Sequence, residues 1–286
     1  MKTILLPTNF SPHSEQAMQF AINIAKLSNA KIIVSHCFFV PNLDINTPVD
    51  ILEELYVQNK KDADQLLTQC CQNIALHKNN EGVPIPTTFI SEQNLPYSHV
   101  RKIVEEHTVD LIVMGIETKK HLFELLGSTA LHVANTSTCP VLLVHDKSQY
   151  KYFNKVFFAI ENVKEDIQKL KKIIPFTRLY DSEISLLHID PLPKDEDALE
   201  AMLYQKQQYE CLLNQIVQEY KHSPNIHFHY NISDETFKKM DQVLKTEEPD
   251  LLVLVHKDRS LLESIFHKST IKQILINNSI PLLIIH

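Results

Sequence analysis

Short, unbroken apolar runs alternate along the chain with longer stretches in which apolar residues recur every three or four positions. Unbroken runs are typical of strands buried on both faces, and the longer spacing is typical of amphipathic helices. In the first half, the runs predict strands at Thr3–Leu6, Lys31–His36, Pro84–Ile90, Leu111–Met114 and Val141–Val144. The periodic stretches predict helices over Ser14–Leu27, 50–77, Tyr97–His107 and Thr129–Asn135. On the second helix, the predicted apolar side carries Leu52, Leu55, Leu66, Leu67, Cys70 and Ile74.

The second half of the chain repeats this order. Asp110–Gly115 and Pro140–His145 have counterparts in Asp250–Val255 and Pro281–His286, and the offset between matching segments drifts from about 153 to about 140 residues. Strands are predicted at 155–159, 183–189, 226–230, 251–255 and 282–285, and helices near 164–174, 196–221, 233–246 and 269–277. An offset of this size is a whole domain, so the chain is a duplication.

The alternation of strands and helices fixes the expected fold class. It predicts two tandem Rossmann-like α/β domains, 1–146 and 151–286, each a five-stranded parallel sheet with helices on both faces. The polar segment Lys147–Asn154 is the predicted joint between them.

The composition limits which binding partners and which cellular compartment we expect. A net charge of −7 argues against nucleic acid as the main partner, because phosphate backbones require a basic surface. Five cysteines without a paired CxxC motif indicate no disulfide framework, as expected in a reducing, cytoplasmic setting. No apolar run approaches the roughly 20 residues that cross a bilayer, and the first strand is too short for a signal-peptide core. We therefore expect a cytoplasmic protein with no membrane partner.

Candidate binding residues gather where the parallel strands of the first copy end. Open parallel sheets bind ligands beyond the carboxyl ends of their strands. His36 and Cys37 stand at the end of the second strand. Glycine permits close backbone approach to phosphates, and a helix N-terminus offers free N–H groups. The candidate site comprises Pro7, Thr8, Asn9, Met114, Gly115, Gly127, Ser128 and Thr129. A plainer interpretation stays open, in which Gly127 is an ordinary loop glycine and Ser128 only caps a helix.

Several of these segments resemble a known family. In order along the chain, Ile4–Ser11, the alanines at 17, 21 and 25, Asp110–Gly115, Gly127–Thr129 and Cys139–Val144 are similar to a universal stress protein domain. The resemblance implies an adenine nucleotide alpha hydrolase-like fold and, in the first copy, binding of ATP with its accompanying Mg²⁺. The chain departs from the family's ATP-binding pattern in three ways. Thr118 replaces the second glycine, the loop is one residue short, and Asn9 replaces an acidic residue.

The second copy departs further from the pattern. Val255–Ser260 and His267–Thr270 replace the glycine loop, and Ile160–Val163 lacks the Pro-Thr pair. We expect this copy to have lost the nucleotide site and to serve as a scaffold.

The sequence gives little support for metal binding, nucleophilic catalysis or a reactive thiol. The chain contains 15 histidines but no HExxH motif, and His36 and His188 occupy equivalent strand ends, which favours inherited packing over a metal site. No GxSxG elbow accompanies Ser11, His13 and Ser14. Cys37 is either a small buried residue or a reactive thiol at the ligand edge. With neither a positioned base nor metal carboxylates, we expect a binder and not an enzyme.

The last strand of each copy indicates how the two copies and other proteins could associate. In the resembled family this strand mediates dimerisation, which implies that the two copies pair within one chain as a pseudo-dimer. Further homo-oligomers and unidentified protein partners stay open, as does a protein contact through the helix at 194–221. The leading hypothesis is a stress-response binding and signalling protein with an ATP or adenine-nucleotide site in the first copy. The alternatives are a nucleotide-free interaction scaffold and a binder of another small ligand.

Overall fold

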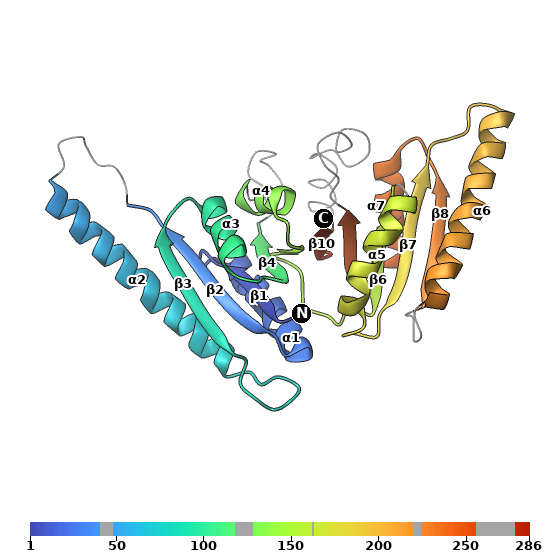
Figure 1. Cartoon of the computed structure of the whole chain (residues 1–286). Coiled ribbons are helices and arrows are strands. Elements are labelled where there is room, and N and C mark those ends of the chain that lie inside the picture. The colour runs from blue at the N-terminus through green and yellow to red at the C-terminus, as the bar shows by residue number, and fades with distance from the viewer. Residues whose placement is uncertain (41–47, 118–127, 162, 220–224, 256–277) are drawn as a thin grey trace. The chain divides into compact units, whose positions relative to one another are not determined.

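The structure, a computed structural model, describes residues 1–40, 48–117, 128–161, 163–219, 225–255 and 278–286 (Figure 1). The chain divides into two compact units, Met1–Tyr150 and Lys151–His286. Among the helices in these ranges, none is both long and apolar enough to cross a membrane.

The first unit is a parallel sheet with helices between its strands. Its strands are β1 (Thr3–Pro7), β2 (Lys31–Phe38), β3 (Thr87–Gln93), β4 (Leu111–Ile116) and β5 (Val141–His145). Its helices are α1 (Pro12–Ser28), α2 (Val49–Ala75), α3 (Pro96–Glu106) and α4 (Ser128–Thr136). Within this unit the strands lie in the order β3-β2-β1-β4-β5, and their pairings are parallel.

This strand order creates the point at which a ligand site is expected. From β1 the chain moves outward to β2 and β3, then returns to the other side of β1 for β4 and β5. Right-handed crossovers therefore place α1 and α2 on one face of the sheet and α3 and α4 on the other (Figure 1). The direction reverses between β1 and β4, which is the topological switch point of the sheet.

Two details of the first unit correct the sequence prediction. The third strand, predicted at Pro84–Ile90, spans Thr87–Gln93. Proline has no N–H to donate to a ladder, so regular pairing begins only after Pro86. Leu66, predicted on the buried side of α2, is 42% exposed, whereas Leu67 is fully buried. Adjacent helical residues point about 100° apart, so the sheet can cover only one of the two leucines.

The second unit repeats the arrangement. Its strands are β6 (Lys155–Ala159), β7 (Glu183–Asp190), β8 (Ile226–Ile232), β9 (Leu251–Val255) and β10 (Leu282–Ile285). Its described helices are α5 (Val163–Thr177), α6 (Glu196–Glu219) and α7 (Thr236–Glu247). Within this unit the strands lie in the order β10-β9-β6-β7-β8, which is the order of the first copy. The helix predicted near 269–277 falls outside the described residues. The fold class predicted from sequence, tandem Rossmann-like α/β, is confirmed.

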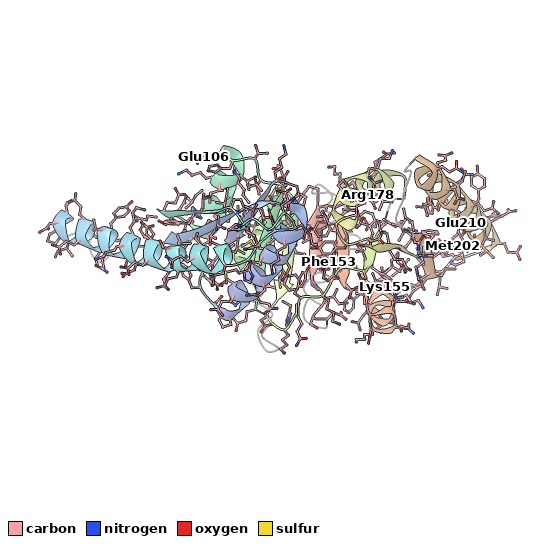
Figure 2. The ribbon with its side chains drawn as sticks, turned by 90° about the horizontal axis from the view of Figure 1, so that it is seen from below. Glu106, Phe153, Lys155, Arg178, Met202 and Glu210 are labelled. Atoms are coloured by element: carbon pink, nitrogen blue, oxygen red, sulfur yellow. The ribbon has the colours of Figure 1, made fainter. Side chains whose placement is uncertain are left out.

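Shared structural features explain why the repeated residues recur. The Asp110 carboxylate accepts hydrogen bonds from the backbone N–H groups of Lys2 and Thr3, and so ties the start of β4 to the start of β1. In the second copy, Asp250 accepts from the backbone N–H of Lys155 in the same way. Lys155 and the nearby core residue Phe153, which is 1% exposed, are both labelled in Figure 2. The repeated aspartates are thus structural.

Candidate functional site

A cavity of about 310 Å³ lies at the switch point of the first unit. It is bounded by the ends of β1, β2 and β4 and by the starts of α1, α3 and α4. Six of the eight residues predicted from sequence line it: Pro7, Thr8, Asn9, Met114, Gly115 and Thr129. Of the other two, Gly127 falls outside the described residues. Ser128 begins α4, and its side chain is likewise not described.

The turn between β1 and α1 is held by its own side chains. Ser11 precedes α1 and Pro12 occupies its first position, both typical of a helix start. The Asn9 side-chain oxygen accepts hydrogen bonds from the hydroxyls of Ser11 and Ser14. Asn9 is one of the predicted binding residues. Since its oxygen is already shared by two serines, only its NH₂ group is left to meet a ligand.

The need for glycine at position 115 is explained by packing as well as by the predicted ligand binding. A Cβ at this position would stand 2.0 Å from the carbonyl oxygen of His13 and 2.8 Å from the backbone nitrogen of Ser14. Both atoms belong to the start of α1, which therefore crosses β4 where only glycine fits. The close approach to Gly115 that the sequence predicts for a phosphate is made in the structure by a neighbouring helix.

Sequence reasoning missed the wall formed by Ser35 of β2 and by the start of α3. Ser35, His99 and Val100 line the cavity beside the predicted residues, and His13 and Ser14 do so from α1. The signal was present in the topology, because β3 ends at the same edge of the sheet and α3 begins three residues later.

His99 is the most unusual member of this wall. It is 2% exposed, and its Nδ1 lies 2.9 Å from Glu92 Oε1 on β3. Glu92 also accepts a hydrogen bond from Lys102 Nζ at 2.6 Å. Partial burial acts to raise the pKa of Glu92, but the hydrogen bonds from His99, Lys102 and Asn94 outweigh it and lower the pKa to about 2. Burial lowers the pKa of His99, although Glu92 opposes that shift. The contact is therefore a hydrogen bond from a neutral imidazole to a carboxylate.

Two polar atoms in this wall have no hydrogen-bond partner among the described residues. They are His99 Nε2 and Ser35 Oγ, and Ser35 is only 1% exposed. Leaving a buried polar group unpaired costs about 1–3 kcal/mol. Such groups often mark the place of a ligand or a water molecule.

The other candidates from sequence have structural explanations. His36 Nδ1 donates to the Thr8 carbonyl at 2.8 Å, and His188 Nδ1 donates to the Ile160 carbonyl at 3.0 Å. The two histidines thus make equivalent hydrogen bonds to a backbone carbonyl in the two copies.

Cys37 lines the cavity, but burial raises its pKa, so its thiol stays protonated near neutral pH. Within the described ranges no three His, Cys, Asp or Glu residues are grouped to hold a metal.

A parallel sheet of this order, with a cavity at its switch point, defines a Rossmann-like α/β protein. Comparison with known proteins specifies the family. The profile of the universal stress protein family matches residues 1–145. Universal stress protein MJ0531 of Methanocaldococcus jannaschii is 31% identical over 144 residues, covering 50% of this chain and 81% of that protein. Universal stress protein MJ0577 of the same organism is 29% identical over 156 residues, covering 51% and 96%.

The fold likeness extends over both copies. The crystal structure of a universal stress protein from Archaeoglobus fulgidus matches with a TM-score of 0.69 at 16% identity, covering 99% of this chain and 97% of that one. This chain belongs to the universal stress protein family.

Proposed function

We propose that this chain is a stress-response binding protein that holds an adenine nucleotide, with ATP as the candidate ligand, in the cavity of its first unit. One observation carries the proposal: six residues predicted from the sequence, at strand ends and at a helix start, line one cavity at the switch point. The volume of about 310 Å³ is at the low end for small-molecule pockets, roughly 300–1,000 Å³. It suits a base and its sugar, with the phosphates extending toward the N-terminus of α4.

The same lining favours binding over turnover. The described residues around the cavity are hydroxyl, imidazole, amide, thiol and apolar groups, with no carboxylate among them. Phosphoryl transfer depends on groups that hold Mg²⁺ and position the nucleophile. Any Mg²⁺ would therefore be carried by the nucleotide. Ligand occupancy would act by changing which protein partners bind, and pairing of the last strands of the two copies stays a prediction.

A second candidate function is a nucleotide-free interaction scaffold. Two observations favour it. Gly115 is required by the approach of His13, so the presence of this glycine is no argument for a phosphate. The side-chain oxygen of Asn9, one of the predicted binding residues, is already occupied by serine hydroxyls.

Calorimetric titration of the purified chain with ATP, with and without Mg²⁺, tests the two candidates. Mass spectrometry of the protein as isolated checks for a co-purified nucleotide. One nucleotide per chain supports a site in the first unit. Two per chain would show that the second copy has kept a site. No binding and no co-purified nucleotide would favour the scaffold.

A blocking variant locates the site. Thr129 is half-buried at the start of α4 and lines the cavity, so Thr129→Trp should fill it and lower ATP affinity at least tenfold. Thr136→Trp is the matched control, because Thr136 is exposed at the other end of the same helix. Gly127→Val tests the phosphate end in the same assay. Unchanged affinity in Thr129→Trp would place the nucleotide elsewhere.

A further inference from the structure

The wall formed by Ser35 and His99 contains hydrogen-bonding capacity that the described protein does not use. Both residues line the cavity of the first unit, and both are at least 98% buried. Neither Ser35 Oγ nor His99 Nε2 has a partner among the described residues. A ligand in the cavity is the natural partner for both atoms.

The geometry of Glu92 determines what His99 presents to that ligand. A carboxylate only accepts hydrogen bonds, so the proton of His99 lies on Nδ1, which faces Glu92 Oε1 at 2.9 Å. Glu92 is itself fixed by Lys102 at 2.6 Å and by Asn94 at 2.9 Å. Burial lowers the pKa of His99, which favours the neutral ring, and in the neutral ring Nε2 carries a lone pair and accepts. The Ser35 hydroxyl can donate as well as accept.

The duplication shows that the fold does not need these groups. The strand registers pair Pro7 with Ser35 in the first copy and Ala159 with Leu187 in the second, so Leu187 occupies the position of Ser35. Leu187 is 1% exposed and is accommodated there. The position of Glu92 is taken by Asn231, and α7, the counterpart of α3, contains no histidine. Among the described residues, the pair formed by Ser35 and His99 is thus particular to the first copy.

We propose that Ser35 and His99 select a nitrogen heterocycle that bears an amino group. The amino N–H donates to His99 Nε2, and a ring nitrogen accepts from the Ser35 hydroxyl. This inference rests on the proposed nucleotide site and adds the residues that read the base. An oxo group in place of the amino group would set one lone pair against another at Nε2, and buried polar sites reject ligands that leave their groups unpaired.

Titration of the full chain with ATP and with ITP, which carries an oxo group in place of the amino group, tests the proposal. Wild type should bind ATP at least tenfold more tightly than ITP, or about 1.4 kcal/mol. His99→Met should bring the two affinities within about twofold, and Ser35→Ala should weaken ATP binding several-fold. Ser185→Ala is the matched control: Ser185 Oγ is also buried and unpartnered, but it lies in the second unit.

The outcomes separate this inference from the proposed function. Equal binding of ATP and ITP to wild type would overturn base selection by Ser35 and His99 while leaving the nucleotide site in place. A preference for ATP that survives His99→Met would likewise overturn it. Failure of both nucleotides to bind would overturn the proposed function and this inference together. A change of affinity in Ser185→Ala equal to that in Ser35→Ala would show that the effect is not local to the cavity.

Discussion

Replacing Gly115 with alanine separates a packing role from a ligand role. A Cβ there would stand 2.0 Å from the His13 carbonyl oxygen, 2.4 Å from its carbon and 2.8 Å from the Ser14 nitrogen. Ordinary carbon contacts are about 3.5–4.0 Å, so the start of α1 would have to move by roughly 1 Å or more. Because the obstructing atoms are backbone, no rotamer change can relieve the clash.

The expected cost follows from this geometry. Overpacking in a tight core costs about 1–3 kcal/mol, and a clash with backbone belongs at the upper end, near 3 kcal/mol. For a unit of this size, such a loss lowers the unfolding midpoint by roughly 6–12 °C. Gly82→Ala is the control: its φ of +78° is unfavourable for alanine, but nothing lies within 4 Å of the added Cβ. We expect it to cost only about 1 kcal/mol.

Peptide-resolved hydrogen exchange in increasing urea measures both variants. The chain has no tryptophan, and its two units need not unfold together, so one spectroscopic midpoint is poorly defined. Peptides from Met1–Tyr150 should lose protection in Gly115→Ala, while those from the second unit should not. A stability equal to wild type combined with weaker ATP binding would refute the packing argument and assign Gly115 to the ligand.

Two further predictions use pairs of neighbouring groups. Leu67→Ala should lower the free energy of unfolding of the first unit by about 2–5 kcal/mol because Leu67 is fully buried. Leu66→Ala should lower it by less than about 1 kcal/mol because Leu66 is 42% exposed. Equal losses, measured by the same peptide-resolved hydrogen exchange in urea, would contradict the assignment of the buried face. Burial acts to lower the pKa of His188, but its hydrogen bonds to Asp190 and a backbone carbonyl outweigh it, so the pKa is raised. The second unit should therefore be most stabilised below about pH 6.5 and lose that contribution as the pH rises through the raised pKa. His188→Gln should flatten this dependence, and a flat wild-type profile would contradict it.

The strand pattern was readable from sequence because the central strands are buried on both faces. Ile4, Leu5 and Leu6 of β1 are at most 1% exposed, and continuous apolar runs are the signature of that environment. The third strand was harder to place, since β3 is at the end of the sheet order and mixes partly exposed and exposed side chains. Its register depends on the prolines before it more than on any hydrophobic period.

The candidate site was only partly predictable for a different reason. The strand-end rule identifies residues that immediately follow a strand, such as Thr8 and Gly115. It does not identify residues that a following helix brings back over the sheet. His99 lies six residues beyond β3, as the fourth residue of α3, and nothing in its local sequence distinguishes it from a buried core histidine. Its unpaired nitrogen becomes visible only when the cavity is assembled.

Comparing the two copies separates what the fold requires from what a ligand requires. Features that occupy the same place in both copies serve the fold: the aspartates that join neighbouring strands, and His36 and His188, which bond equivalent carbonyls. Ser35 fails this test, because its counterpart Leu187 is a buried apolar residue. A buried hydroxyl without a partner is a cost that the fold could have avoided with leucine. Ser185 in the second unit carries the same cost, so what distinguishes Ser35 is its place in the lining of the cavity, where the proposed ligand would supply the missing hydrogen bond.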